Sequence, residues 1–508
     1  MKRATILIMS ITIISKVLGF ARELVLSYIY GASAITDAYL ISQMIPTQIF
    51  SLISVGLATA FIPMYSRVIK ERGEGAANSY VSNLMSALFL LITIIAGFVF
   101  LFPHHIVRLF ATGFDEDTLN LAVNFTNIAI FGVYFTVSFN IFAAYLRIKG
   151  RFALPEIVNL PMNLILIGSL FISAKTNLIA LAWGSLLATA TQFILLIPAI
   201  RKEGYKYKAG LHLNDNYLRT MALLALPVML SHSVDRINVL IDRRLASVIA
   251  IGGISALNYA DRLGGFIRGF FVNSVATVLY PTISKMAIED NMQGLKSSIV
   301  EAMVMICLIV IPSAIGAMLF SEQIVVLLLG RGAFTVKAAT MTAVALFYYS
   351  IGLIPTGLES ILARAFYALQ DTKTPMINAT IGVVINIVLN FILSKYMGIG
   401  GLALATSISA IVTAILMFIT LRKKIGPFGL KELTKSFIKI SIASLIMGLI
   451  AYGSFILSGS YLSQNLSLIM AIGIGALTYA TIIYFMKIPE VDSTIIAIKN
   501  KLKSFKQK

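Results

Sequence analysis

The sequence predicts an all-α polytopic membrane protein with 14 transmembrane helices. Hydrophobic residues make up 58% of the 508 residues and charged residues only 12%, which leaves too little charge for the surface of a soluble protein of this length. Apolar runs of about 20 residues recur along the chain, and each can cross roughly 30 Å of hydrocarbon. The single cysteine, Cys307, excludes an internal disulfide and a cysteine-based metal site.

The predicted spans follow the apolar runs between polar, glycine- and proline-containing segments. They cover residues 4–30, 33–64, 81–103, 120–147, 155–174, 177–201, 217–248, 253–282, 295–320, 339–367, 375–396, 399–423, 433–458 and 464–487. Several are longer than about 25 residues, which predicts tilted or bent helices. The first run resembles a signal peptide, but it continues past Lys16 and Arg22 without a convincing cleavage site, so we predict an uncleaved first helix.

The placement of basic residues predicts the orientation of the chain. Of the 41 Lys and Arg residues, 29 fall in the inter-helix segments and tail of one side and five in those of the other side. Because Lys and Arg collect on the cytoplasmic side of membrane proteins, we expect both termini in the cytoplasm. This asymmetry also accounts for the net charge of +19 without nucleic acid as a partner.

Matches between the two halves of the chain indicate an internal repeat. Residues 58–67 match residues 276–285 with an offset of 218, and Pro155 matches Pro375 with an offset of 220. An even number of spans in each repeat makes the two copies parallel, with the binding site expected in a cavity between them.

The repeat divides the chain into four predicted parts. A six-helix N-terminal lobe covers residues 1–205, and a six-helix C-terminal lobe covers residues 217–424. The last two helices, within residues 433–487, lie outside the repeat. Residues 488–508 form a basic tail, which we expect in the cytoplasm.

Charged residues inside the predicted spans concentrate on the first, second, seventh and eighth helices. They are Lys16, Arg22, Glu23, Asp37, Asp235, Arg236, Asp242, Arg243, Arg244, Asp261, Arg262 and Arg268. A charge at the centre of the bilayer costs roughly 2.5–3.5 kcal/mol, so these groups should face one another or a wet cavity. In one interpretation, opposite charges on the seventh and eighth helices only neutralise each other. The interpretation that we favour is a cationic cavity for an anion, because Glu23 cannot pair with both Lys16 and Arg22, and guanidinium groups suit phosphate oxygens.

A second group of side chains carries oxygen atoms. Asn386 and Asn390 are one helical turn apart on the eleventh span, Thr406 is on the twelfth, and Asp242 lies in the same half of the sequence. Such oxygens suit a hard monovalent cation such as sodium, but Asn and Thr also commonly form hydrogen bonds between membrane helices. The sequence contains no HExxH motif, phosphate-binding glycine loop or nucleophile elbow, so we expect neither an enzyme nor any other metal or cofactor.

Several motifs carry a resemblance to a known family. They are residues 15–23 (SKVLGFARE), 36–39 (TDAY), 259–263 (YADRL) and 365–375 (AFYALQDTKTP). Together they resemble the MurJ/MviN family, which are lipid II flippases of the multidrug/oligosaccharidyl-lipid/polysaccharide exporter superfamily. The family usually has Arg where this chain has Lys16, and a basic residue is absent near Gln48 on the second helix.

The resemblance implies a two-lobed fold with a cationic central cavity. It implies that lipid II, the diphosphate-linked peptidoglycan precursor, moves from the inner to the outer leaflet of the bacterial cytoplasmic membrane. Its implied substrate-binding residues are Lys16, Arg22 and Arg262, with Ser15, Glu23, Asp37 and Asp261 nearby, Asp37 also as a gate. Its implied sodium ligands are Asp242, Asn386 and Thr406, with Asn390 at the position where an acid would help most.

The expected mechanism is alternating access, in which two lobes rock about the cavity. The membrane potential, an ion gradient, or both would drive it, since each negative charge that moves outward gains about 2.3 kcal/mol per 100 mV. The alternatives are export of another lipid-linked oligosaccharide and multidrug or cation antiport. A scaffold without transport is disfavoured by the cost of the buried charges. We expect a monomer in contact with membrane lipids.

Overall fold

The computed structural model describes residues 2–492, and every regular element within them is a helix. The greater part of the predicted basic tail, residues 493–508, lies outside the described residues. The side chains of residues 2–8, 51–59, 227, 228 and 230–235 lie outside them too, and these include the side chain of Asp235. The prediction of an all-helical protein is confirmed.

The chain divides into two compact units. The first contains residues 1–255 and 331–335, and the second contains residues 256–330 and 336–508. Helices of the first unit are α1 (Lys2–Tyr30), α2 (Ala34–Leu101), α3 (Pro103–Phe110), α4 (Glu116–Ala129), α5 (Gly132–Ile148), α6 (Leu154–Ile157), α7 (Asn159–Lys175), α8 (Ile179–Ile194), α9 (Ile197–Lys202) and α10 (Asn216–Ile249). The predicted lobe boundary between residues 205 and 217 stays a prediction.

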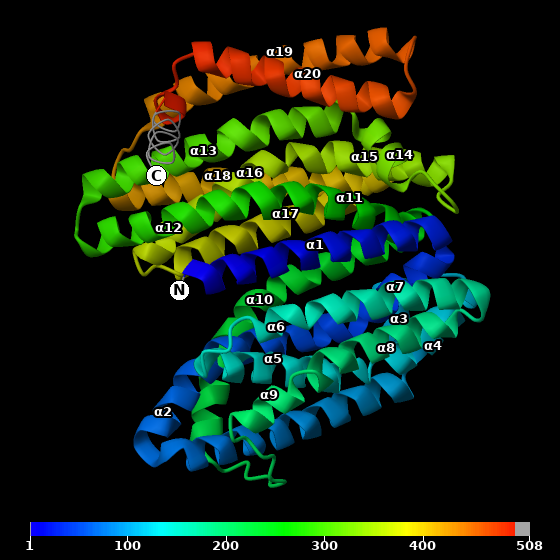
Figure 1. The fold of residues 1–508 in the computed structure, drawn as a ribbon, viewed down its shortest axis with the longest axis vertical. Helices are drawn as coiled ribbons and strands as arrows, with labels where there is room; N and C mark the ends of the chain where they lie inside the picture. Colours follow the sequence, from blue (N-terminus) through cyan, green and yellow to red (C-terminus); the bar gives the residue numbers. More distant parts are fainter. Residues whose placement is uncertain (1, 493–508) are drawn as a thin grey trace. The chain divides into compact units, whose positions relative to one another are not determined.

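The second unit begins within α11 (Gly253–Ile267) and continues through a short π-helix, η1 (Arg268–Val272). Its other helices are α12 (Asn273–Ile288), α13 (Met292–Leu319), α14 (Ser321–Leu329), α15 (Val336–Ile351), α16 (Leu353–Ala368), α17 (Lys373–Met397), α18 (Ile399–Ile425), α19 (Leu430–Gly459) and α20 (Gln464–Phe485). The last two helices pack against each other, and α19 also packs against α13 (Figure 1).

Polar residues define where several helices begin. The Ser33 hydroxyl accepts a hydrogen bond from Thr36 N at the start of α2, and Asp215 Oδ1 accepts from Tyr217 N and Leu218 N at the start of α10. Such side chains satisfy N–H groups that have no partner within the helix. Helix boundaries are therefore set by local sequence signals.

The structure differs from the predicted spans in three places. The spans 33–64 and 81–103 each extend into the polar segment between them, and the two helices that α2 comprises meet at Gly73, whose φ of 80° is not helical. The spans 120–147 and 339–367 are each broken, and the halves of each pair meet at 43°. Within the span 253–282, η1 interrupts the α-helix.

The described helices have the length and composition of membrane spans. Nine of them are long and apolar enough to cross a membrane, and eleven when each bent pair counts as one span. Outward-facing apolar side chains such as Leu449 and Leu477, which are 75% and 72% exposed, fit contact with lipid. The protein is therefore a multi-pass membrane protein.

Candidate functional site

Asp37, in the first turn of α2, holds the start of α11. Its Oδ2 accepts a hydrogen bond from Gly252 N at 2.9 Å, and its Oδ1 accepts from Ser255 N at 2.7 Å and from the Ser255 hydroxyl. Asp37 is 2% exposed and Ser255 is fully buried. A carboxylate that accepts N–H groups at a helix N-terminus satisfies unpaired donors and complements the helix dipole. Asp37 thus joins α2 to the beginning of α11.

The segments around Asp37 approach one another at backbone distance. Ala333 N donates a hydrogen bond to Tyr28 O at 2.8 Å, and Gly113 N donates to the Ser247 hydroxyl at 3.1 Å. A Cβ added at Gly332 would lie 2.1 Å from Tyr28 O, and one at Gly113 would lie 2.2 Å from Ser247 O. At both positions a side chain would collide with the backbone of another segment of the first unit, so these contacts require glycine.

The charged residues of α1 are placed differently from one another. Arg22 Nη2 lies 2.7 Å from Glu23 Oε1 in an ion pair, with 26% of the Arg22 side chain and 7% of the Glu23 side chain exposed. Lys16 is exposed, and Ser15 is half-buried. The structure therefore couples Arg22 to the acid next to it and leaves the Lys16 side chain exposed.

On α10, two arginines contact neighbouring elements of the first unit. Arg243 Nη1 donates to Ile254 O, and Arg236 Nη1 donates to Gln48 Oε1, both at 3.2 Å. Asp242 is half-buried on the same helix. Arg243 thus contributes to the same α10–α11 connection as Asp37.

In the second unit, Asp261 and Arg268 form an ion pair along one helix face. Arg268 Nη2 lies 2.5 Å from Asp261 Oδ1, although seven residues separate them. A Cβ added at Gly264 would lie 3.4 Å from Arg268 Nη1, so a residue without a side chain leaves the guanidinium room to reach back. Arg262, next to Asp261, is exposed. The charge of Asp261 is therefore compensated by the first residue of η1, which directly follows α11.

The structure also brings together the oxygen-bearing residues of α17 and α18. Asn390 Nδ2 donates to Asn386 Oδ1 at 2.7 Å, and Asn386 Nδ2 donates to Thr406 Oγ1 at 3.3 Å. Both asparagines are buried. Amide and hydroxyl oxygens are ligands that bind a sodium ion, so the chemistry of these buried side chains fits the predicted cation. Asp242, the fourth predicted ligand, belongs to the first unit.

Sequence reasoning missed Ser255, the partner of Asp37. A signal was present, because Ser255 follows Asp37 by 218 residues, the offset of the predicted repeat. It also missed that Arg243 binds a backbone carbonyl, since no sequence pattern identifies the acceptor.

Comparisons with known proteins point to one family. The family model described as "Lipid II flippase MurJ" matches residues 26–472. A relative from Thermotoga maritima is 29% identical over 95% of this chain and 96% of its own length, and one from Vibrio cholerae is 27% identical over 95% and 96%. Both are described as "Probable lipid II flippase MurJ".

Solved structures also match this chain. The structure described as "Lipid II flippase MurJ, inward closed conformation" matches with a TM-score of 0.83 and 28% identity, over 95% of this chain and 98% of that one. An inward-facing multidrug resistance MATE family transporter of the MOP superfamily matches with a TM-score of 0.67 over 85% and 99% of the chains. At 17% identity, the latter shares the fold alone.

Proposed function

This chain belongs to the MurJ family of lipid II flippases, and we propose that it moves lipid II from the inner to the outer leaflet of the bacterial cytoplasmic membrane. The observation that carries the proposal is the family match over residues 26–472, supported by relatives that align along nearly their whole length. A flippase is a transporter rather than an enzyme, in agreement with the absence of catalytic motifs from the sequence.

Arg22 and Arg262 are the residues we propose for the diphosphate of lipid II, with Lys16 and Ser15 near the former. Arg262 is exposed and follows Asp261, whose charge is compensated by Arg268. Glu23 fixes the Arg22 side chain in place through its ion pair. Planar guanidinium groups suit phosphate oxygens because they offer paired donors.

For Asp37 we propose the role of a gate rather than of a substrate ligand. Its carboxylate is buried and accepts hydrogen bonds from the chain at the start of α11. Breaking these bonds would release that end of the first unit, as alternating access requires.

Two contacts that join equivalent positions of the predicted repeats support alternating access between them. Gly113 approaches Ser247, and Gly332 approaches Tyr28; each residue of the first pair is related to one of the second by an offset of 219. Fourteen spans are also compatible with the helices, since α1, the first limb of α2 and α10 can join the eleven apolar spans.

The membrane potential, a sodium gradient, or both would drive the cycle in this proposal. The potential favours outward movement of the diphosphate by about 2.3 kcal/mol per charge and 100 mV. Asn386, Asn390 and Thr406 would bind the sodium ion, with Asp242 as a charged ligand. We further propose a monomer with both termini in the cytoplasm, because the basic segments collect on that side.

The decisive experiment replaces the essential lipid II flippase of a depleted bacterium with this chain. Growth and normal cell shape are expected, and Arg262→Ala should abolish rescue and lipid II translocation while Arg331→Ala, an exposed arginine in an inter-helix segment, leaves both intact. Failure of the wild-type chain at normal membrane levels would favour the second candidate, export of another lipid-linked oligosaccharide or of a cation. We retain this second candidate because the MATE transporter has the same fold.

A further inference from the structure

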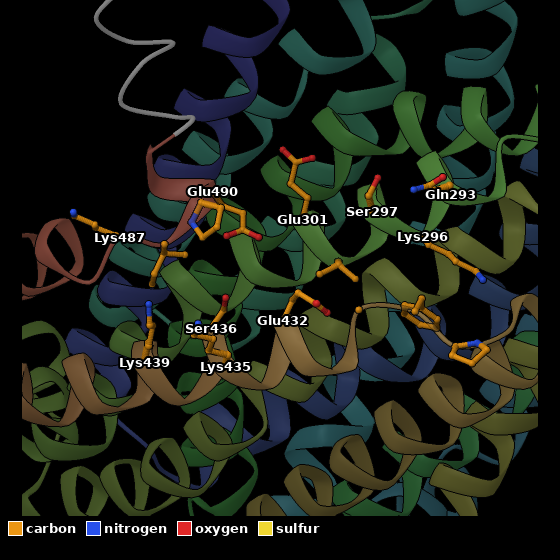
Figure 2. Close-up of a pocket in the computed structure, with 16 residues that line it drawn as sticks. Gln293, Lys296, Ser297, Glu301, Glu432, Lys435, Ser436, Lys439, Lys487 and Glu490 are labelled. Carbon is orange, nitrogen blue, oxygen red and sulfur yellow. The ribbon is translucent and has the colours of Figure 1, made fainter.

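A cavity of about 860 Å³ opens in the second unit, and none of the predicted site residues lines it. Its wall is made by the start of α13, the segment between α18 and α19, the first turns of α19, and the residues that follow α20 (Figure 2). The volume is within the range of pockets that bind small ligands. On the predicted orientation, this end of the helices faces the cytoplasm.

Four lysines from three elements contribute to the wall. They are Lys296 of α13, Lys435 and Lys439 of α19, and Lys487 just after α20. Lys439 Nζ donates to Met486 O at 2.7 Å and so holds the end of α20 against α19. Among the described residues, the other three lysines have neither an ion pair nor a hydrogen bond. Their ammonium groups are available to an anionic group such as phosphate.

The first turn of α19 adds backbone donors. Its N-cap residue is Gly429, which has a left-handed φ of 40° and no side chain to accept hydrogen bonds from the helix. Glycine is required there, because a Cβ would lie 2.2 Å from Val300 Cγ2 of α13. A helix N-terminus without a side-chain cap presents N–H groups and a partial positive charge. It reinforces the attraction of the lysines for phosphate.

Three glutamates line the same cavity. In the view of Figure 2, Glu301, Glu432 and Glu490 lie between Lys296 on one side and Lys435, Lys439 and Lys487 on the other. They would repel a purely anionic ligand and attract an ammonium group. Across the described part of the chain, no group of three His, Cys, Asp or Glu side chains could hold a metal ion. The cavity therefore suits a ligand that carries both charges.

Apolar groups complete the wall and continue outside it. Phe428 and Ile488 line the cavity and are buried against the helices. On α19 next to Lys435, Phe437 and Ile438 are 39% and 51% exposed, as expected of side chains that contact acyl chains. The ligand should thus have an apolar part as well as a charged one.

We propose that this cavity binds the phosphoethanolamine headgroup of a membrane phospholipid in the cytoplasmic leaflet. The phosphate lies against the lysine ammonium groups and the first turn of α19, and the primary amine lies against the glutamates. The acyl chains follow the exposed apolar side chains of α19. This site holds a resident lipid and is separate from the residues proposed for lipid II.

The test measures lipid binding to the delipidated full-length protein in detergent. Apparent affinities are determined for phosphatidylethanolamine, phosphatidylglycerol and phosphatidylcholine, and soluble phosphoethanolamine is used as a competitor. Phosphatidylethanolamine should bind about tenfold or more tightly than the other two, since charged hydrogen bonds distinguish them. Soluble phosphoethanolamine should compete only weakly, because it has no acyl chains.

Two paired variants examine the two charges of the headgroup. Lys435→Gln with Lys487→Gln, and Glu301→Gln with Glu432→Gln, should each weaken phosphatidylethanolamine binding about tenfold. The matched control is Lys423→Gln with Lys431→Gln, which removes two exposed lysines that do not line the cavity. The ratio of phosphatidylethanolamine to phosphatidylcholine affinity is compared within each variant. This ratio separates a loss of headgroup selectivity from a general loss of folded protein.

Four results would overturn the proposal. The first is phosphatidylglycerol binding that is as tight as that of phosphatidylethanolamine and insensitive to the glutamate pair, which would make the cavity an anion site. The second is equal weakening by the control pair, which would indicate a general surface-charge effect. The third is equal competition by soluble phosphoethanolamine, and the fourth is equal binding of phosphatidylcholine.

Discussion

Asp37 and Ser255 are 218 residues apart in the sequence and joined by two hydrogen bonds, both to Asp37 Oδ1. One comes from Ser255 N at 2.7 Å and the other from the Ser255 hydroxyl. This separation equals the offset of the predicted repeat, so the prediction makes the two residues equivalent positions of its two copies. A single buried carboxylate therefore links the start of α2 to the start of α11.

Asp37→Asn should destabilise the protein, because an amide offers only one acceptor oxygen to donors that now use two. The expected loss is about 1–3 kcal/mol in the free energy of unfolding. It is measured by thermal unfolding in detergent, with Asp117→Asn, an exposed acid of α4, as the control. Wild-type stability of Asp37→Asn would show that its hydrogen bonds do not hold α11.

Gly332→Ala should destabilise the first unit, because its Cβ would meet Tyr28 O at 2.1 Å. Backbone cannot move aside as a flexible side chain can, and the expected cost is at least about 1–3 kcal/mol. The matched control is Gly168→Ala, where nothing lies within 4 Å of the added Cβ. Thermal unfolding compares the two variants, and equal midpoints would contradict the close approach.

Asp371, between α16 and α17, should make stability depend on acid pH. The hydrogen bond from Lys424 Nζ, and then the bond from Thr374 N, lower the pKa of Asp371 from its ordinary 3.8 to about 2. Since the pKa is lower in the folded state, the carboxylate stabilises the fold above the ordinary value, and this contribution disappears as the pH falls through about 2.

Asp371→Asn should therefore lower the unfolding temperature at pH 7 and converge with the wild type below the folded-state pKa. The measurement is a series of thermal unfolding curves from neutral to acid pH. Asp117→Asn serves again as the control for a lost exposed acid. A difference from the wild type that stays constant with pH would refute the contribution of the Lys424 pair.

Asn386→Ala should remove both a hydrogen bond between α17 and α18 and any protection by sodium. Asn378→Ala is the matched control, because Asn378 Nδ2 donates to Thr420 Oγ1 at 2.8 Å between the same helices, apart from the proposed ion site. Both variants should lose about 1–3 kcal/mol of stability. Only Asn386→Ala should lose the rise in unfolding temperature that sodium, compared with potassium, gives the wild type.

If sodium raised the unfolding temperatures of Asn386→Ala and Asn378→Ala equally, Asn386 would be an interhelical contact and not a sodium ligand. The absence of any sodium effect on the wild type would remove the ion from the proposed cycle.

Much of the fold follows from local features of the sequence. Runs of apolar residues and polar caps such as Ser33 and Asp215 locate the helices, since hydropathy and capping depend on neighbours within a few positions. How far the two helices of α2 continue into the polar segment, up to Gly73, could not be predicted, because the expected boundaries relied on hydropathy alone. Polar residues end a membrane span, but they do not end a helix.

The sequence by itself determined a helical membrane protein, its charged helices, and the residues that resemble the flippase family. Only the tertiary structure decided the partners: Ser255 for Asp37, Ile254 O for Arg243, and Arg268 for Asp261. It alone also brought four lysines and three glutamates from α13, α19 and the end of α20 around one cavity. The physical reason is distance along the sequence. Hydropathy depends on residues within a few turns of helix, whereas these hydrogen bonds and the cavity depend on distant segments that meet only after folding.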